Sequence, residues 1–392
     1  MRVIETRIER RGAEARFVGL IQPQGAQAEE LFVSVAAEHA DFLRDSADPL
    51  LCALLAPCMH TGEDLQIDPP VSPLLLSRLQ RLQDILALWH PEFHRIEVRA
   101  HGAGGDNAQP PGVLTLFSGG VDSFYTLLRS LHPGKADVPR ATHLLFVKGL
   151  EQPHSVLSGV QASIGQVEVI ARQTGTQLLV ASTNLRDRFT LNYERYYFGA
   201  AMAATVHALT AGIGTLLMPS SHSYAHMEPL GSHPLLDPLW SSERLDVIHH
   251  GAEARRVDKI AAILAEWTSA LPLLRVCLKN SGGNFNCGRC RKCLRTMVAL
   301  QMLGALGKAG SFPGELPADA AVLLRLERDS WLEELEDFGR ERTPHSAVTA
   351  LIGEVRRHCR RSQGLRLLME NTPLAAPLWR ALDRWRQSRW RD

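Results

Sequence analysis

The chain has 392 residues, of which 45% are hydrophobic, so we expect a globular protein with a substantial buried core and two or three domains. Its formal net charge of +1 provides no bulk field that would favour nucleic acid or a membrane surface, and neither is expected as a partner. The N-terminal residues Met1–Arg11 are charged throughout, unlike a secretory signal, and the seven cysteines include a close group of four. Both features favour a reducing, cytoplasmic location in which cysteines bind metal rather than form disulfides.

Residues 1–109 mix strand and helix patterns and are predicted to form an α+β N-terminal accessory domain. Strand patterns cover Arg2–Arg10, Leu31–Ala37 and Arg95–Ala100, and an amphipathic helix is predicted over Pro73–Trp89. Cys52 and Cys58 lie in an apolar segment and are expected to be core residues. The segment 101–112 is rich in glycine and proline, which indicates a linker and a domain boundary.

The stretch Val113–Leu127 reads VLTLFSGGVDSFYTL and predicts a strand, a tight glycine turn and the start of a helix. The two glycines allow a sharp turn and a close approach to a ligand. The exposed amides of a first helical turn, together with the helix dipole, attract phosphate. No G-K-[ST] sequence follows, so this loop differs from the Walker loop.

The string SGGVDS, residues 118–123, resembles the S-G-G-x-D-S signature of the ATP pyrophosphatase (PP-loop) family. The resemblance implies a parallel-sheet, HUP-like nucleotide-binding domain over residues 110–300. It also implies cleavage of ATP between its α and β phosphates, usually to adenylate a substrate oxygen, with Asp122 helping to place Mg²⁺. The residues implied to bind the pyrophosphate part of ATP are Ser118, Gly119, Gly120, Asp122 and Ser123.

Strand and helix patterns alternate from residue 113 to about 300, which predicts an α/β domain with a parallel sheet wrapped by helices. The predicted strands are Val113–Phe117, His143–Val147, Gln177–Ala181 and Thr215–Met218, and the predicted helices are Ser123–Leu131, Val156–Thr174 and Tyr196–Ala211. Ligands of such sheets lie at the carboxyl ends of the strands. The family resemblance places adenine after the second strand, beside Lys148 and Gly149.

The uncharged stretch Gly199–Met218 is long enough to raise the question of a membrane span. Its alanine, glycine and threonine content instead indicates a buried helix, a turn at Gly212–Gly214 and a strand. Two polar stretches follow, Ser220–Pro238 and His249–Lys259, which are interpreted either as a surface loop and a solvated helix start or as substrate and phosphate contacts. Lys259, Arg255 and Arg195 are candidates for contacts with phosphate or carboxylate, and Lys259 and Arg195 are counted with Asp122 as catalytic candidates.

Four cysteines form a C-x9-C-x2-C-x2-C pattern at Cys277, Cys287, Cys290 and Cys293. Two overlapping C-x-x-C turns and a fourth thiol provide a complete tetrahedral shell for Zn²⁺, and a closed shell of this kind indicates a structural role. An iron–sulfur cluster is the alternative, because the C-x2-C-x2-C spacing also occurs there.

The glycine loop followed by this cysteine pattern resembles the 7-cyano-7-deazaguanine synthases of the queuosine pathway over about residues 110–300. Cys287–Arg295 reads CGRCRKCLR, and its final arginine lies one position earlier than in the family pattern. The resemblance implies a ligase with a structural zinc that adenylates 7-carboxy-7-deazaguanine. It then forms an amide with ammonia and activates the amide with a second ATP to make the nitrile.

Two differences from that family keep other products open. The segment Tyr193–Gly199 stands where the family usually has Pro-Gly-Arg-Asn, and the chain is longer at both ends. Divergent relatives with such extensions include members of antiviral-defence operons, some of which join a deazaguanine to a protein amine. The alternatives are therefore protein conjugation, with a protein partner bound by the N-terminal domain, a tRNA-thiolation enzyme, and a non-catalytic nucleotide-binding partner protein.

Residues 301–392 are predicted to be helical, with apolar residues at helical spacing over Ala320–Phe338 and Ala347–Ser362. The last segment interleaves Trp379, Trp385 and Trp390 with arginines. This pattern favours an amphipathic helix that packs its tryptophans on the body of the protein over a site for nucleic acid.

Overall fold

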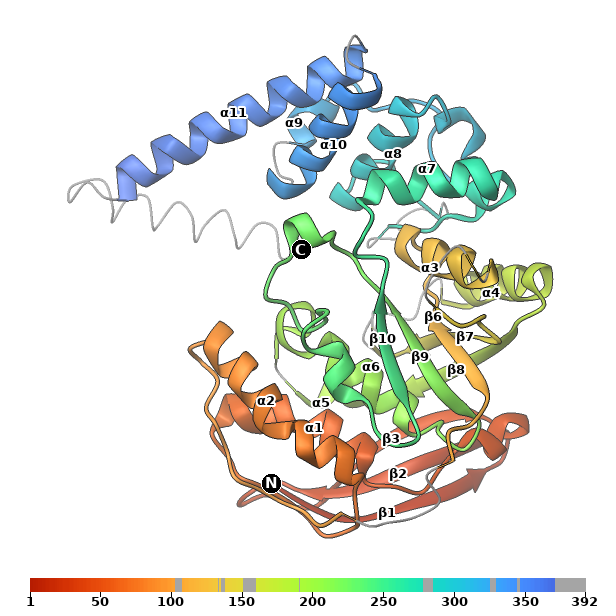
Figure 1. The fold of residues 1–392 in the computed structure, drawn as a ribbon, viewed down its shortest axis with the longest axis vertical. Helices are drawn as coiled ribbons and strands as arrows, with labels where there is room; N and C mark the ends of the chain where they lie inside the picture. The colour runs from red at the N-terminus through yellow and green to blue at the C-terminus, as the bar shows by residue number, and fades with distance from the viewer. Residues whose placement is uncertain are drawn as a thin grey trace. The chain divides into compact units, whose positions relative to one another are not determined.

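The computed structural model describes residues 1–102, 108–132, 134, 138–150, 160–189, 191–277, 285–324, 329–343 and 346–370 (Figure 1). The chain divides into two compact units, Met1–Ala270 and Leu271–Asp392. The first unit contains the sheet and the glycine loop, and the second contains the cysteine group.

One ten-stranded sheet organises the first unit, with the order β10-β9-β6-β7-β8-β3-β2-β1-β4-β5. Its strands are β1 (Arg2–Arg11), β2 (Glu14–Gln22), β3 (Glu29–Ala36), β4 (Leu65–Ile67), β5 (Val98–Arg99), β6 (Gly112–Leu116), β7 (His143–Lys148), β8 (Gln177–Thr183), β9 (Ile213–Pro219) and β10 (Asp246–His250). The helices of this unit are α1 (Asp48–Thr61), α2 (Pro73–Trp89), α3 (Val121–Leu131), α4 (Val160–Thr174), α5 (Leu185–Arg188), α6 (Phe198–His207) and α7 (Arg256–Glu266). Short helical turns are η1 (Ala37–Phe42), η3 (Tyr193–Tyr197), η4 (Tyr224–His226) and η5 (Asp237–Trp240), and η6 (Thr268–Leu273) begins in this unit and ends in the second.

The half of the sheet from β10 to β8 is parallel throughout. The chain enters at β6, continues to β7 and β8, and returns to the other side of β6 for β9 and β10. The direction of travel therefore reverses between β6 and β9, as in Rossmann-like domains, and ligands of such folds bind at the carboxyl edge where this reversal occurs. The prediction of an α/β fold with a parallel sheet is confirmed, as are its four strands, whereas β10 was not predicted.

Helices cover both faces of this parallel half because successive crossovers run in opposite directions. α3 packs against β6 and β9, α4 packs against β7 and β8, and α7 packs against α3, whereas α6 packs against α1 on the other face (Figure 1). The stretch Gly199–Met218 contains most of α6, a turn and most of β9, so the interpretation as helix, turn and strand is confirmed.

The N-terminal strands β1, β2 and β3 are antiparallel and extend the same sheet, because β3 pairs with β8 through Val33–Thr183 and Ser34–Ser182. The predicted strands at Arg2–Arg10 and Leu31–Ala37 are confirmed, and the helix at Pro73–Trp89 has its predicted bounds. Only Val98–Arg99 of the predicted strand Arg95–Ala100 is extended, while β2 and α1 were not predicted.

α1 is the centre of the core beneath these N-terminal strands. Every residue from Asp48 to Met59 is buried, and a Cβ at Gly19 of β2 would lie 2.3 Å from Leu50 Cδ1. The sheet is thus continuous across the predicted boundary near residue 109, and α1 packs on α6 from the later part of the chain. Whether residues 1–109 can fold separately stays a prediction, and residues 103–107 of the expected linker lie outside the described residues.

Over the residues that the structure describes, the regular elements of the second unit are helices joined by turns and irregular segments. Its helices are α8 (Arg291–Met302), α9 (Ala320–Leu324), α10 (Asp329–Arg342) and α11 (Ala347–Glu370), with a short turn η7 (Leu306–Lys308). Arg356 of α11 is buried and donates to Glu336 and Glu333 of α10, which fixes the two helices together. The segment with Trp379, Trp385 and Trp390 lies outside the described residues.

Candidate functional site

The glycine loop lies at the carboxyl end of β6, beside β9, where the strand order reverses. Gly119 has φ +80°, a conformation that favours glycine, and Gly120 is extended and precedes the first turn of α3. Ser123 Oγ donates to the Gly120 carbonyl oxygen at 2.9 Å, which closes the turn from within. The loop therefore presents the N-terminus of α3, with its partial positive charge, at the ligand-binding edge of the sheet.

Asp122 lies in the first turn of α3 and holds two cations from α7. Arg256 Nη1 donates to Asp122 Oδ2 at 2.5 Å, and Lys259 Nζ donates to Asp122 Oδ1 at 3.3 Å. Lys259 Nζ also donates to the carbonyl oxygen of Ser220, the first residue after β9, at 2.6 Å. The Lys259 ammonium group thus contacts both the first turn of α3, which follows β6, and the loop that follows β9. The strand order reverses between β6 and β9.

The electrostatics of this group favour an anion. Lys259 is 1% exposed, and burial lowers the pKa of its ammonium group while the Asp122 carboxylate acts in the opposite direction. Arg256 and Lys259 face the Asp122 carboxylate at the positive end of a helix, and the Glu253 carboxylate also acts on Lys259. The helix N-terminus and the two cations offer a phosphate group hydrogen-bond donors at this edge of the sheet.

Polar and aromatic side chains from the end of β10 and the loop after it also contact α3 near this group. Tyr125 donates to Glu253 at 2.8 Å and stacks on His250, whose Nδ1 lies 3.0 Å from Thr126 Oγ1. Burial lowers the pKa of His250, so its ring is neutral near pH 7. Gly251 has φ +93°, which allows the chain to turn closely past Tyr125 and Lys259.

The other predicted nucleotide and phosphate residues take different positions. Lys148 ends β7 and Gly149 follows with φ +89°, at the same carboxyl edge of the sheet as the glycine loop. Arg255 precedes α7 and donates to Asp258 at 2.7 Å, as part of a cap on that helix. Arg195 lies in η3, where its guanidinium covers the ring of Tyr196 at 5.3 Å. Among the described contacts, none joins Arg195 to Asp122, so the structure does not place Arg195 beside the glycine loop.

The stretch His249–Lys259 was a candidate for substrate and phosphate contacts in the sequence analysis, but Arg256 within it was not singled out. The stretch His249–Lys259 contains the end of β10, a turn and the start of α7, so it is neither a simple solvated helix nor a loop. The arginine pair at 255 and 256 was the available signal, but sequence alone does not say which arginine faces inward. In the structure Arg256 is 7% exposed and faces Asp122, whereas Arg255 stays at the cap.

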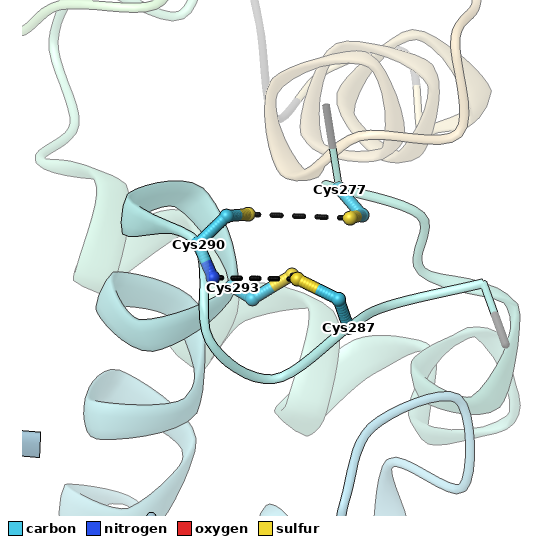
Figure 2. Close-up of side chains that lie close together, drawn as sticks. All are labelled: Cys277, Cys287, Cys290 and Cys293. Atoms are coloured by element: carbon cyan, nitrogen blue, oxygen red, sulfur yellow. Dashed lines mark hydrogen bonds between the residues drawn. The ribbon is translucent and has the colours of Figure 1, made fainter. Parts of the chain in front are cut away.

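The four cysteines of the second unit come together around one point (Figure 2). All four sulfur atoms lie within 4.8 Å of one another, with Cys287 and Cys293 at 3.9 Å and Cys277 and Cys290 at 4.0 Å. Four sulfurs at about 2.3 Å from a central zinc ion lie about 3.8 Å apart, whereas a disulfide joins its sulfurs at about 2.05 Å. The group therefore has the spacing of a site that could hold a metal ion, and the prediction that these four residues assemble is confirmed.

The surrounding chain is built to hold this arrangement. Asn286 is 1% exposed, and its side-chain oxygen accepts the backbone N–H groups of Val276 and Cys277 at 2.8 and 3.2 Å. Cys290 N–H donates to Cys287 Sγ at 3.3 Å across the turn, and Gly288 in that turn has φ +69°. The neighbouring Cys290 thiol, followed by burial, raises the pKa of Cys293, an effect that a bound divalent cation reverses because it favours thiolates.

Comparison with protein-family models, curated proteins and solved structures gives no match to this chain. No described helix combines the length and the apolar character needed to cross a lipid bilayer.

Proposed function

We propose that this protein is an ATP-dependent ligase that adenylates a carboxylate and releases AMP and pyrophosphate. The observation that carries the proposal is the position of Asp122, Arg256 and Lys259 beside a glycine turn at the strand reversal. The resemblance of SGGVDS to the PP-loop signature adds the bond that is cleaved. Membership of that family is part of the proposal.

The residues present suit the parts of ATP that the proposal requires. The backbone N–H groups at the start of α3 and the cations Arg256 and Lys259 would bind the pyrophosphate as it leaves. The carboxylate oxygens of Asp122 are of the hard type that Mg²⁺ prefers, and Mg²⁺ bound there would spread the charge that develops on the phosphates. Lys148 and Gly149 lie at the same sheet edge, where the adenine is proposed to bind.

The substrate proposed by resemblance is a carboxylate on a flat heterocycle, with 7-carboxy-7-deazaguanine as the first candidate. An acyl adenylate is a reactive mixed anhydride and forms an amide with ammonia or with an amine on a protein. Both acceptors stay within the proposal, as does later conversion of the amide to a nitrile. Zn²⁺ is proposed for the cysteine group, with a structural role because four thiolates leave no position open for a substrate.

A tRNA-thiolation activity has less support from the structure. That chemistry requires a reactive thiol near the loop, but Cys277, Cys287, Cys290 and Cys293 form the group for which a metal ion is proposed. Cys52 and Cys58 are buried in α1, and burial raises the pKa of the Cys58 thiol to about 12, so its nucleophilic thiolate is scarce at neutral pH.

The test is a product analysis with ATP, Mg²⁺ and 7-carboxy-7-deazaguanine. The expected products are AMP and pyrophosphate, together with carboxylate-dependent exchange of labelled pyrophosphate into ATP. Lys259→Met should reduce exchange by about 10²-fold or more, because it removes a charge aimed at the leaving group. Formation of ADP and phosphate would overturn the proposal.

A further inference from the structure

A second group of polar side chains lies at the carboxyl edge of the same sheet, on the face opposite α3. His249 Nδ1 lies 2.6 Å from Asp237 Oδ2, and the two side chains are 4% and 0% exposed. The carboxylate of Asp237 also accepts from Ser232 Oγ at 2.7 Å and from the backbone N–H of His233 at 3.3 Å. Three donors thus fix one buried carboxylate, and the imidazole of His249 is one of them.

This hydrogen bond decides which nitrogen of His249 carries the proton. A carboxylate only accepts, so Nδ1 donates, and whenever the ring carries a single proton the lone pair is on Nε2. Within the part of the chain that the structure describes, Nε2 is buried and has no hydrogen-bond partner. Buried polar atoms are normally satisfied, so a buried basic nitrogen without a protein partner points to a ligand or a transferred proton.

The position of His249 relates it to the glycine loop. His249 and His250 are neighbours at the end of β10, and consecutive side chains of a strand point to opposite faces of the sheet. The His250 side chain contacts Thr126 of α3, while His249 points to the side of η5 and of Met218, its partner on β9. The His250 carbonyl accepts the Ser220 N–H at 2.8 Å, and the Ser220 carbonyl accepts Lys259. The proposed phosphate site and His249 are therefore linked through the backbone across one sheet edge.

The other polar groups that face His249 already have hydrogen-bond partners, so His249 is the side chain that remains available to act as a base. Asp237 from η5 is committed to its three donors, and His233 Nδ1 already accepts the backbone N–H of Leu235 at 3.0 Å. Burial lowers the pKa of His233, followed by the effect of His249, and His222 acts in the same direction from the loop after β9. Trp89 of α2 packs edge-on against His233, with ring centroids 4.7 Å apart, so the N-terminal region also borders this group.

We propose that Nε2 of His249 is the general base that removes a proton from the amine acceptor, and that Asp237 positions it; this inference rests on the proposed ligase function. The amine nitrogen forms a C–N bond to the carbonyl carbon of the acyl adenylate. The bond from that carbon to the AMP oxygen breaks, and AMP leaves with the electron pair. The ammonium proton of the forming amide passes to Nε2 of His249 and then to water. General-base assistance of this kind typically contributes about 10²–10⁴-fold to a rate.

The test separates adenylation from acyl transfer with His249→Asn, whose side-chain amide can still donate to Asp237. Pyrophosphate exchange with ATP and 7-carboxy-7-deazaguanine should stay within about twofold of the wild type. Amide formation from ammonia should fall by about 10²-fold or more and be partly restored by added imidazole. Hydroxylamine is a strong nucleophile that is neutral near pH 7 and needs less help from a base, so hydroxamate formation should stay nearly unchanged. His143→Asn, at the opposite end of the parallel strands, serves as the matched control and should leave all three rates unchanged.

Asp237→Asn provides the second variant, read by ¹⁵N NMR of the histidine rings. The wild type should show His249 with its proton on Nδ1, and the variant should lose this tautomer preference and lose amide formation more than exchange. Equal losses of exchange, hydroxamate and amide in His249→Asn would show a structural role and overturn the inference alone. Unchanged amide formation would overturn it as well. If the wild type shows no exchange, the proposed ligase function fails and the acceptor step fails with it.

Discussion

Replacement of Asp122 by asparagine should both stop ATP cleavage and destabilise the first unit, because it removes the charge held between two buried cations. Asp122 Oδ2 lies 2.5 Å from Arg256 Nη1, and Oδ1 lies 3.3 Å from Lys259 Nζ. The side chains of Arg256, Lys259 and Asp122 are 7%, 1% and 16% exposed. Breaking a buried ion pair costs about 3–5 kcal/mol, and the partial exposure of Asp122 places the expected loss near the lower end, at about 3 kcal/mol.

The assay is urea unfolding followed by tryptophan fluorescence, since Trp267 packs on Phe124 of α3 and reports on this region. Asp84→Asn is the matched control: Asp84 pairs with Arg95 at 2.7 Å, but the two side chains are 46% and 63% exposed. That surface pair should contribute less than about 1 kcal/mol. Pyrophosphate at 100 times its dissociation constant should add about 2.7 kcal/mol to the stability of Asp122→Asn by mass action. Because pyrophosphate supplies the missing negative charge, its dissociation constant should be lower for Asp122→Asn than for the wild type.

A double-mutant cycle tests the cause of the loss. Adding Lys259→Met to Asp122→Asn removes one of the unpaired cations, so the double variant should be more stable than the sum of the single changes predicts, by about 1–3 kcal/mol. Strict additivity, or an Asp122→Asn protein as stable as Asp84→Asn, would refute the account of Asp122 as the counter-charge of a buried cation pair.

Three further predictions concern the metal, the buried histidines and the N-terminal strands. Purified protein should carry about one zinc per chain, and iron in elemental analysis would contradict the zinc assignment. Gly288→Ala should lower the zinc content and the stability, because its Cβ would lie 2.6 Å from Pro313 Cγ at a φ of +69°. Gly304→Ala is the control, since Gly304 has a φ of +63° but lies in open space, and this variant should keep its zinc. Burial lowers the pKa of His207 in the folded protein, so the unfolded chain binds this proton more tightly than the folded protein does. The free energy of unfolding should therefore be constant above about pH 6.5 and should fall as the pH drops below that value. His207→Gln should flatten that part of the urea-midpoint profile, and an unchanged slope would contradict the assignment. Deletion of residues 1–100 should leave insoluble protein, because β3 pairs with β8 and α1 packs on α6; a soluble, cooperatively folded truncation would instead show an independent domain.

The parallel core was predictable because its signals are local. β6 is a short apolar run that is buried along its whole length, and the glycine turn and helix start follow at once in sequence. The cysteine group was predictable for the same reason, since three of its members lie in one seven-residue stretch from Cys287 to Cys293. Local spacing of this kind survives folding because a tight turn fixes which side chains meet.

The missed elements lack a periodic signal. α1 is buried on every side and contains Pro57, so it shows no polar face from which a helix period could be recognised. β10 is five residues long and ends in two histidines, which resemble the polar loop that precedes it. Amphipathic periodicity reports a contrast between core and solvent, and neither element has that contrast.

The residue pairs proposed to carry chemistry depend on the topology of the sheet. Arg256 and Asp122 are 134 positions apart, and they meet because α7 follows the last parallel strand and packs on the helix that follows the first. Asp237 and His249 are nearer in sequence, but their contact requires η5 to lie beside the end of β10. Sequence shows that acidic and basic residues occur after these strands, and only the strand order shows which ones face each other.

Two elements of the N-terminal region, β3 and α2, lie differently with respect to the proposed site. β3 extends the sheet at β8, on the side away from the strand reversal, so it adds core without approaching the glycine loop. α2 reaches the opposite side of the unit, where Arg78 donates to the Pro238 carbonyl at 2.8 Å and the Leu74 N–H donates to Glu243 at 2.8 Å. These bonds fix α2 against η5, which carries Asp237, and place Trp89 on His233. A change of acceptor in such a ligase would therefore act through α2 and the loop between β9 and β10, while the cation pair at α3 stays as it is.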